Sequence, residues 1–291
     1  MTLENIMQKI GFIGQGWIGK NYADNFVEQG FKVIRYSLDA EYNGNKEKIK
    51  DCEIVFIAVP TPTTPEGFNC DILRQVIKLV GKGKIAVIKS TIMPGTTETM
   101  QKENPNIFIL HSPEFLTRHT AAHDAANPTR NIIGIPVDNE IYRKKAQAVM
   151  DILPKAPYEI ICRSLDAELV KYGGNCFFYF KNIFMNMLYD LSQKLGCDWE
   201  EVRQMIAADP RIGEEHTHPV NKGGRGAGGD CLIKDFEAFI RMYKTNVADE
   251  TGLNALINLR DKNISLLMRS KKDLELLKGV YGEDVVNKII K

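Results

Sequence analysis

Residues 9–30, KIGFIGQGWIGKNYADNFVEQG, decide the fold of this chain. The first six residues read as a short buried strand, and the rest turns into a helix that ends at Gly30. Between them the glycines follow the GxGxxG spacing of a dinucleotide-binding loop: the first makes the tight turn, the second admits a pyrophosphate and the third packs helix on strand. The alternative is a glycine-rich turn without a ligand. The predicted cofactor-binding residues of this loop are Gly14, Gln15, Gly16, Trp17, Ile18 and Gly19.

The segments that follow alternate between strand-like and helix-like patterns. The short apolar runs that read as strands are FKVIRYS, CEIVFIAVP, KIAVIKST, NIFILHSP and NIIGIP. Residues 71–83, DILRQVIKLVGKG, read as a helix between two of them. Strands that alternate with helices predict a doubly wound parallel sheet, an α/β fold of the Rossmann type. The alternation runs to about residue 164, so residues 1–164 are predicted to form a dinucleotide-binding domain.

Beyond residue 164 the pattern becomes helical. Residues 166–195 form one long stretch that is apolar on several faces, as expected of a domain connector, a dimer core or both. Two more helical stretches follow at 232–244 and 253–270. Residues 165–291 are therefore predicted to form an all-helical central domain. The apolar helix 166–195 also predicts a homodimer, in which two such helices pack together.

Composition narrows the class of protein. A net charge of +1 gives no electrostatic case for nucleic acid or an anionic membrane as a partner. The six cysteines are scattered without a CxxC pair, which suits a reduced, cytoplasmic protein. No apolar run reaches the length of a membrane span, and the N-terminus lacks the layout of a signal peptide. We expect a cytoplasmic protein that binds no metal, nucleic acid or membrane.

The end of the second strand bears on the choice of cofactor. In dinucleotide-binding folds an acidic residue there holds the ribose hydroxyls of NAD, and here Ser37 stands at that position. Asp39 would serve if the strand runs two residues longer, whereas Arg35 would meet the 2′-phosphate of NADP. The sequence favours NAD and leaves NADP open.

Seven motifs occur in order along the chain. They are VFIAVPTPT (55–63), KSTIMPGTTE (89–98), SPEFL (112–116), NPTRNIIG (127–134), AELVKYGGN (167–175), RIG (211–213) and GAGGDCLIKD (226–235). Together they resemble the UDP-glucose/GDP-mannose dehydrogenase family over nearly the whole chain. The resemblance implies an NAD-dependent oxidation of a nucleotide sugar, in which a primary alcohol becomes an aldehyde and then a carboxylate. It also implies that Pro60, Thr61 and Thr91 line the cofactor.

Cys231 is the predicted nucleophile. It follows a glycine run and starts an amphipathic segment, and a helix N-terminus lowers a thiol pKa and favours the thiolate. A thiolate can add to an aldehyde as a thiohemiacetal, which gives up a hydride to become a thioester. Asp235 lies one helical turn on, and the resemblance implies that it positions water or a proton carrier. The alternative for any one cysteine is a small core hydrophobe.

Four further residues are predicted to act with Cys231. Lys171 and Asn175 are an i, i+4 pair that would stabilise an oxyanion, although such a pair is usually a solvated helix face. The resemblance implies that Glu114 assists hydrolysis of the thioester through water and that Thr91 helps to hold that water. It also implies that Arg211 reaches the site of a neighbouring subunit.

The chain departs from the family pattern in three respects. Family enzymes carry a third, C-terminal domain that grips the uridine diphosphate, and this chain is expected to lack it. Arg118 stands where the family has a second glutamate, and Ala227 replaces an aromatic residue of the glycine loop. Lys222 and Arg225 in that loop are predicted to bind a phosphate or carboxylate of the substrate, unless they are a solvated basic loop.

These departures leave two alternatives beside the nucleotide-sugar dehydrogenase. One is a partner-dependent or non-catalytic dinucleotide-binding protein. The other is a dehydrogenase of a smaller hydroxy acid or sugar phosphate held by Lys222 and Arg225. In each catalytic case Gly228 is predicted to let the substrate approach the backbone of the cysteine loop.

Overall fold

The structure is a computed structural model that describes residues 8–284. Within these residues the chain forms two compact units: the first comprises residues 8–61 and 70–171, and the second comprises 62–69 and 172–284. The change of unit at residue 171 falls inside the long helix α7 (Ser164–Leu195), whose first residue coincides with the predicted domain boundary. The division at 164 stays a proposal.

A seven-stranded sheet forms the centre of the first unit, in the order β2-β1-β3-β6-β7-β8-β9. Its strands are β1 (Lys9–Ile13), β2 (Lys32–Tyr36), β3 (Ile54–Ile57), β6 (Ile85–Ile88), β7 (Phe108–His111), β8 (Arg130–Ile135) and β9 (Tyr158–Arg163). The first five are parallel, and β8 and β9 are parallel to each other. Strand β8 joins β7 in the antiparallel sense through the pair His111 and Gly134. The doubly wound Rossmann-type fold is confirmed, and the sheet is mixed rather than wholly parallel.

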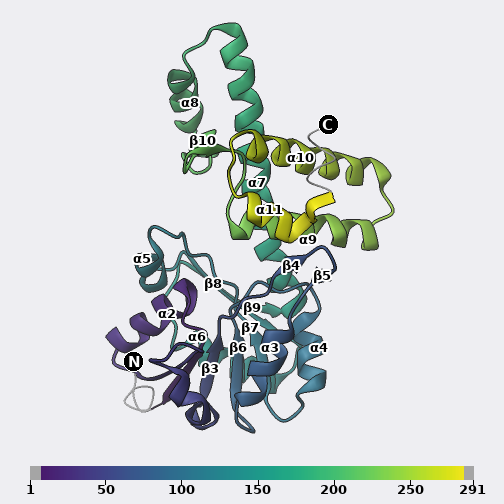
Figure 1. The fold of residues 1–291 in the computed structure, drawn as a ribbon. Coiled ribbons are helices and arrows are strands. Elements are labelled where there is room, and N and C mark those ends of the chain that lie inside the picture. The colour runs from purple at the N-terminus through teal and green to yellow at the C-terminus, as the bar shows by residue number, and fades with distance from the viewer. Residues whose placement is uncertain (1–7, 285–291) are drawn as a thin grey trace. The chain divides into compact units, whose positions relative to one another are not determined.

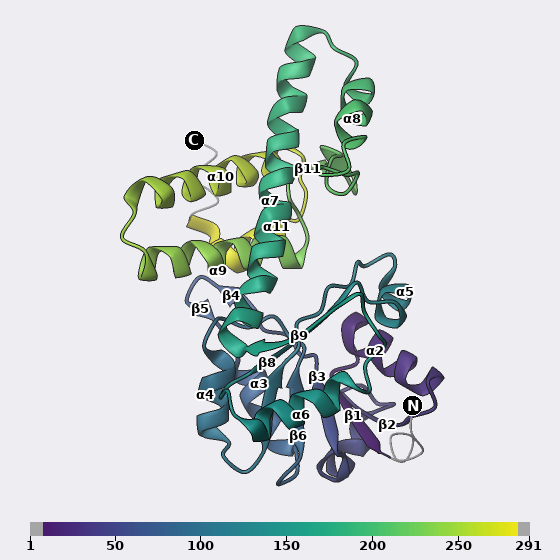
Figure 2. The same ribbon diagram turned by 180° about the vertical axis from the view of Figure 1, so that it is seen from behind.

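Helices cover both faces of this sheet. They are α2 (Trp17–Glu28), α3 (Asp71–Val76), α4 (Thr96–Glu103), α5 (Ala121–Ala126) and α6 (Glu140–Met150), with the 3₁₀ helices η1 (Asn43–Asp51) and η2 (Ile77–Leu79). Helix α3 lies in front of the sheet in Figure 1, and α6 lies in front of it in Figure 2. The central strands are buried on both faces and are almost entirely Ile, Val and Phe, as expected of such a sheet.

The helix predicted at 71–83 was wrong over its last four residues, after α3 and the 3₁₀ helix η2. The chain leaves helical geometry at Val80, which is extended, and Gly81 then packs against the backbone of Lys50. A Cβ on Gly81 would lie 2.1 Å from the Lys50 carbonyl oxygen, so the segment is fixed by a close backbone approach that helical periodicity does not report.

The second unit is helical. It contains most of α7, then α8 (Trp199–Ala207), α9 (Asp230–Asn246), α10 (Glu250–Arg269) and α11 (Leu274–Tyr281). Its core includes Tyr179 of α7 stacked on Phe236 of α9, with ring centroids 3.8 Å apart. The three helices predicted at 166–195, 232–244 and 253–270 are confirmed as α7, α9 and α10.

Two small hairpins also belong to the second unit. One pairs β10 (Val220–Asn221) with β11 (Gly224–Arg225), and the other pairs β4 (Thr63–Thr64) with β5 (Gly67–Phe68). The β4–β5 hairpin comes from the middle of the Rossmann sequence, yet Arg241 of α9 donates a hydrogen bond to the Thr64 carbonyl oxygen at 2.7 Å. Across residues 8–284 no helix is long and apolar enough to span a membrane.

Candidate functional site

The glycine loop after β1 has the geometry of a dinucleotide-binding loop. Gly14 has φ +88°, and its N–H donates to the Tyr36 carbonyl oxygen at 2.8 Å. A Cβ on Gly14 would lie 2.1 Å from the Ala58 carbonyl oxygen, and one on Gly19 would lie 1.9 Å from the Gly14 carbonyl oxygen. Gly16 has no neighbouring atom within 4 Å of its Cβ position. Two glycines are therefore required by packing, and the middle one faces open space.

The start of helix α2 fits the pyrophosphate of a dinucleotide. Gly16 is its N-cap residue, no side chain caps the first turn, and that turn holds no acidic residue. The free N–H groups and the helix dipole favour an anion there. Because β2 and β3 lie on opposite sides of β1, this loop opens at the point where the strand order reverses, which is where doubly wound folds bind nucleotides.

The residues at the end of β2 are engaged with one another. Ser37 Oγ donates to Asp39 Oδ2 at 2.7 Å, so the two side chains predicted at the ribose lie together. The guanidinium of Arg35 forms an ion pair with Asp24 of α2 at 2.6 Å. Arg35 is thereby neutralised by a carboxylate, which disfavours its use for a 2′-phosphate.

The loops after β3 and β6 are tied together at the same edge of the sheet. Ser90 Oγ donates to the Val59 carbonyl oxygen at 2.7 Å and accepts from the Val59 N–H at 2.9 Å. Thr61 Oγ1 donates to the Thr91 carbonyl oxygen at 2.6 Å. Pro60, Thr61 and Thr91, which the sequence predicts at the cofactor, therefore belong to one connected pair of loops at the carboxyl ends of these strands.

Lys171 and Glu114 are in direct contact. Lys171 Nζ donates to Glu114 Oε1 at 2.8 Å and to the Glu114 carbonyl oxygen at 2.7 Å. The other carboxylate oxygen accepts from the Leu116 N–H at 2.8 Å. Both side chains are nearly fully buried, at 9% and 3% exposure, so each charge is compensated by the other. The structure thus brings together a predicted oxyanion-stabilising cation and a predicted carboxylate.

Sequence reasoning missed two buried ionisable residues beside this pair. Lys89 directly follows β6; its Nζ donates to Ser112 Oγ at 3.1 Å and lies 4.3 Å from the ring centroid of Tyr22. Burial lowers the pKa of Lys89 to about 7, opposed by the Glu114 charge and assisted by the Lys171 charge. His111 at the end of β7 is fully buried, and burial lowers its pKa to about 3. In the sequence, these two residues are marked only by a basic residue type at the end of the apolar runs IAVI and FIL.

In the second unit, Cys231 is exposed and is the second residue of α9. Asp235, one turn later, is fully buried and accepts hydrogen bonds from the side chains of Asn175 and Lys234. The predicted partners Asn175 and Asp235 are therefore in direct contact. The structure places Cys231 in the first turn of a helix, as the sequence predicts, with Asp235 four residues on.

The predicted substrate-binding residues have different surroundings. The Arg225 guanidinium donates hydrogen bonds to Asn186 and to Asp190 of α7, at 2.9 and 2.7 Å. Its donors are therefore used by residues of the same unit. Arg211 is highly exposed and pairs with Asp209 through both carboxylate oxygens. Lys222 is exposed in the β10–β11 turn. A substrate role for Arg225 would require its contacts with α7 to open.

Gly228 is close-packed. A Cβ there would lie 2.2 Å from Asp273 Oδ2. The nearest atoms are the ends of the flexible Asp273 and Lys272 side chains, so packing favours a glycine here without requiring one. Its predicted role at the substrate stays a prediction.

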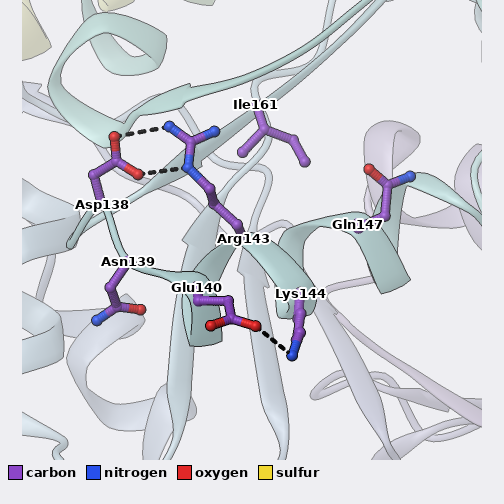
Figure 3. Close-up of a pocket in the computed structure, with 7 residues that line it drawn as sticks. All are labelled: Asp138, Asn139, Glu140, Arg143, Lys144, Gln147 and Ile161. Atoms are coloured by element: carbon purple, nitrogen blue, oxygen red, sulfur yellow. Dashed lines mark hydrogen bonds and ion pairs between the residues drawn. The ribbon is translucent and has the colours of Figure 1, made fainter.

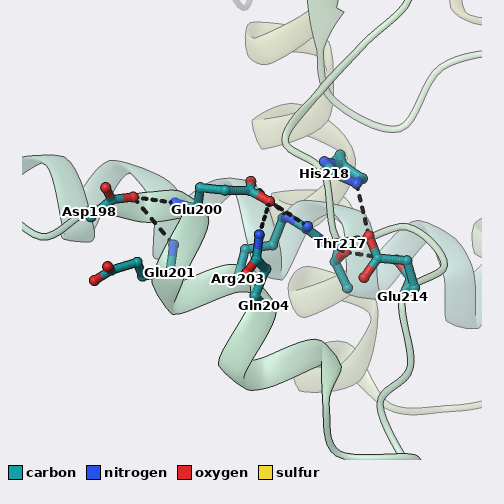
Figure 4. Close-up of polar contacts among 8 residues, drawn as sticks. All are labelled: Asp198, Glu200, Glu201, Arg203, Gln204, Glu214, Thr217 and His218. Carbon is teal, nitrogen blue, oxygen red and sulfur yellow. Dashed lines mark hydrogen bonds and ion pairs between the residues drawn. The ribbon is translucent and has the colours of Figure 1, made fainter.

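The segment that carries Arg211 is anchored by a second feature that the sequence did not suggest. Arg203 of α8 is buried and donates to Glu200, Glu214 and Thr217, as Figure 4 shows. The Glu214 carboxylate also contacts the His218 ring. It therefore connects Arg203 of α8 with His218 of the segment that follows this helix. This network fixes the path of the chain after α8.

A surface hollow of the first unit has about 680 Å³ of space and is lined by none of the predicted site residues. Its charged side chains pair among themselves, Asp138 with Arg143 and Glu140 with Lys144 (Figure 3). Among residues 8–284 no group of three or more His, Cys, Asp and Glu side chains is arranged to hold a metal ion. The candidate residues thus form two sets, one at the carboxyl ends of β1, β3, β6 and β7 in the first unit and one at the start of α9 in the second.

Comparison with known protein families identifies the family of this chain. The NAD binding domain of the UDP-glucose/GDP-mannose dehydrogenase family matches residues 35–152, and the central domain of that family matches residues 165–262. The chain belongs to this family. It therefore carries an NAD-binding domain, and the resemblance stated from the motifs is confirmed. The glycine loop lies before the matched range, so its assignment rests on its geometry.

Individual relatives are distant. The UDP-glucose 6-dehydrogenase of Rickettsia bellii is 28% identical, over 84% of this chain and 57% of the relative. The UDP-glucose 6-dehydrogenase YwqF of Bacillus subtilis is also 28% identical, over 81% of this chain and 54% of the relative. The chain spans a little over half the length of these curated relatives.

Two solved structures share the fold. The UDP-glucose dehydrogenase of Pyrobaculum islandicum has a TM-score of 0.75 at 24% identity, covering 92% of this chain and 72% of that one. The 3-hydroxyisobutyrate dehydrogenase of Mycobacterium tuberculosis has a TM-score of 0.69 at 17% identity, covering 94% of this chain and 98% of that one. At these identities the likeness establishes a common fold.

Proposed function

We propose that this chain is an NAD-dependent nucleotide-sugar dehydrogenase that oxidises a primary alcohol to a carboxylate through Cys231, with UDP-glucose as the first substrate to test. The observation that carries the proposal is the pairing of the predicted residues. Lys171 contacts Glu114, and Asn175 contacts Asp235, in a chain that belongs to the family. Each contact joins residues of two different motifs, which is not expected of unrelated charges.

The proposed reaction balances as follows. One alcohol, two NAD⁺ and one water give one carboxylate, two NADH and three protons. NAD, when bound, accepts the hydride of each oxidation. The Cys231 thiolate adds to the aldehyde carbon, and loss of the second hydride from that carbon converts the thiohemiacetal into a thioester. Water then attacks the thioester carbon, the C–S bond breaks, and the thiol is released with the carboxylate.

The other residues have roles that follow from their contacts. The buried Lys171 ammonium is a donor that stabilises negative charge on the substrate oxygen during attack. The Glu114 carboxylate is the base that takes a proton from the attacking water. Asp235 holds the Asn175 amide by accepting its hydrogen bond, and so orients a neutral donor for the same oxygen.

Two measurements test this proposal. NADH formation should reach two equivalents per UDP-glucose consumed, with UDP-N-acetyl sugars, GDP-mannose and sugar phosphates compared in parallel. Replacing Cys231 with alanine should abolish formation of the acid. The matched control is Cys197→Ala, because Cys197 is the other exposed cysteine among the described residues, and that variant should keep its activity. A Cys231→Ala protein that still forms the acid at the normal rate would contradict the proposed nucleophile.

We also propose that the chain forms a homodimer through α7. Phe177, Phe184 and Leu191 are exposed on this helix at intervals of seven residues, so they lie along one side of it. An exposed apolar stripe of this kind marks an interaction surface. Phe184→Ser should shift the mass measured by light scattering from dimer to monomer, whereas Leu38→Ser, at an isolated exposed leucine, should not. A wild-type monomer at micromolar concentrations would contradict this proposal.

A smaller substrate is the second candidate. The fold match to a 3-hydroxyisobutyrate dehydrogenase extends over nearly the whole of both chains, so the two-domain architecture alone accommodates a small hydroxy acid. The same assay, with small hydroxy acids added to the substrates, separates the candidates, because a single two-electron oxidation of a hydroxyl group yields one NADH and no new carboxylate. A partner-dependent protein would bind NAD and form no NADH until a second chain is added.

A further inference from the structure

A four-residue turn follows helix α10, at residues 270–273. Lys271 and Asp273 both have left-handed backbone conformations, with φ +55° and +54°. Such conformations are uncommon for residues other than glycine, and two within three residues indicate a turn that the surrounding structure determines closely. Asp273 is also the N-cap residue of α11. The turn is therefore held by something besides its own preference.

Its side chains bind the backbone of the loop that leads to Cys231. Ser270 Oγ accepts from the Arg225 N–H at 3.0 Å, and Lys272 Nζ donates to the Gly226 carbonyl oxygen at 3.1 Å. Asp273 Oδ2 accepts from the Gly229 N–H at 2.8 Å. Three successive contacts thus follow the loop from β11 to the first residue before α9.

Asn263 of α10 adds a fourth attachment between these. Its side-chain oxygen accepts from the Ala227 N–H at 2.7 Å, and its side-chain nitrogen donates to the Ala227 carbonyl oxygen at 2.9 Å. Asn263 is fully buried, so these two bonds satisfy polar groups that would otherwise be costly. The loop at 224–229 is consequently bonded at four of its six residues.

The contact of Asp273 has a specific consequence for helix α9. Gly229 is the N-cap residue of this helix, and it has no side chain with which to cap the first turn. Asp273 accepts instead from the N–H of Gly229 itself, which is one of the N–H groups without an intrahelical partner at this end of the helix, two residues before Cys231. A carboxylate in this position also interacts favourably with the positive end of the helix dipole.

These attachments lie beyond the part of the chain that matches the family. The central-domain match ends at residue 262, whereas Asn263, Ser270, Lys272 and Asp273 follow it. The cysteine loop is inside the match, and the groups that hold it are outside. The family model therefore does not describe the groups that hold the loop.

We propose that Asp273, with Lys272, is a positioning residue that holds the Cys231 loop in its reactive geometry by binding the backbone on the N-terminal side of α9. The proposal rests on the proposed function only for the role of Cys231. It requires that removing the Asp273 acceptor loosens the loop, and that an uncharged acceptor at the same position restores it. A misplaced nucleophile loses rate without losing cofactor affinity, since the glycine loop of the first unit does not change.

The test compares Asp273→Ala with Asp273→Asn. Asparagine retains a side-chain oxygen for the Gly229 N–H, and alanine does not. The matched control is Glu275→Ala, which removes an exposed carboxylate two residues on. Hydrogen exchange of residues 226–231, followed by mass spectrometry, should be about 3- to 10-fold faster in Asp273→Ala, as expected for one lost hydrogen bond. It should stay near the wild-type rate in Asp273→Asn and in Glu275→Ala.

Kinetics then decides the functional part. Asp273→Ala should lower kcat about 10- to 100-fold with the KM for NAD unchanged, and Asp273→Asn should recover most of the rate. Unchanged exchange in Asp273→Ala would overturn the attachment itself. Faster exchange with an unchanged kcat would overturn the positioning role. If the wild-type protein forms no NADH from any substrate, the proposed function fails, while the exchange experiment still decides whether Asp273 holds the loop.

Discussion

Replacing Lys89 with methionine should stabilise the protein, and the gain should shrink as the pH rises. Lys89 is buried, and its amine has one hydrogen-bond acceptor, Ser112 Oγ, with the ring of Tyr22 on another side. Glu114 is already paired with Lys171, so its charge compensates Lys89 only in part. An ammonium group in such a place is costly, and the side chain loses its proton at a pKa of about 7.

The sign and size of the effect follow from proton linkage. The pKa of Lys89 is about 7 in the folded protein and 10.5 when the side chain is in water. Between these values the unfolded chain binds a proton that the folded chain does not, so the free energy of unfolding rises with pH. The full difference is roughly 5 kcal/mol, and about 3 kcal/mol of it falls between pH 7 and pH 9.5. A methionine has no proton to bind and removes this dependence.

The assay is urea unfolding at a series of pH values from about 6 to 9.5. The free energy of unfolding of Lys89→Met should exceed that of wild type most at and below pH 7, and the two should converge by about 1.4 kcal/mol for each pH step above it. Subtracting the free energy of unfolding of wild type from that of the variant at each pH removes the contribution of the titratable groups that both proteins share. Lys82→Met, at an exposed lysine, should show a constant difference from wild type. A constant difference for Lys89→Met would refute the reasoning, because Lys89 would then keep its proton on folding.

Three further predictions test other contacts. Lys181→Met removes the hydrogen bonds of Lys181 Nζ to the carbonyl oxygens of Ile212 and Gly213. Trypsin should then cleave after Arg211 several-fold faster than in wild type. An equal rate of cleavage would contradict an anchoring role for Lys181. Glu168→Ala leaves two backbone amides and a hydroxyl at the start of α4 without their acceptor, and should cost about 3 kcal/mol in urea unfolding, against no measurable loss for exposed Glu140→Ala. Gly16→Val should weaken NAD binding at least tenfold by calorimetry with the thermal midpoint unchanged, since its side chain enters open space; intact affinity would place the cofactor elsewhere.

The sequence predicted those parts of the fold that depend on short-range patterns. The glycine loop was recognisable because the requirement at Gly14 and Gly19 is steric and has a fixed spacing. The long apolar helix and the two later helices were recognisable from their periodicity. The direction of β8 was not, because a strand buried on both faces has the same apolar pattern whether it runs parallel or antiparallel to its neighbour.

Contacts between distant residues were beyond the reach of the sequence. The segment at 62–69 reads as a proline-rich loop of the Rossmann sequence, and only the structure shows that it joins α9 and its neighbours through contacts such as that of Arg241. A lysine after a strand reads as a solvated charge, so the burial of Lys89 could not be foreseen. Arg225 was read as a cation available to substrate, whereas its donors are used by Asn186 and Asp190.

Two glycines of the candidate site show why a residue type alone does not indicate a ligand. Gly16 faces open space at the start of a helix without a side-chain cap, so packing does not explain the missing side chain, whereas the pyrophosphate predicted there would. Gly228 lies beside the ends of the Asp273 and Lys272 side chains, so packing favours a glycine there as well as a ligand would. The sequence assigned both to ligand contact by the same argument. In the structure the surroundings of the two glycines differ. The neighbours of Gly228 belong to the turn at 270–273, whose side chains bind the backbone of the cysteine loop.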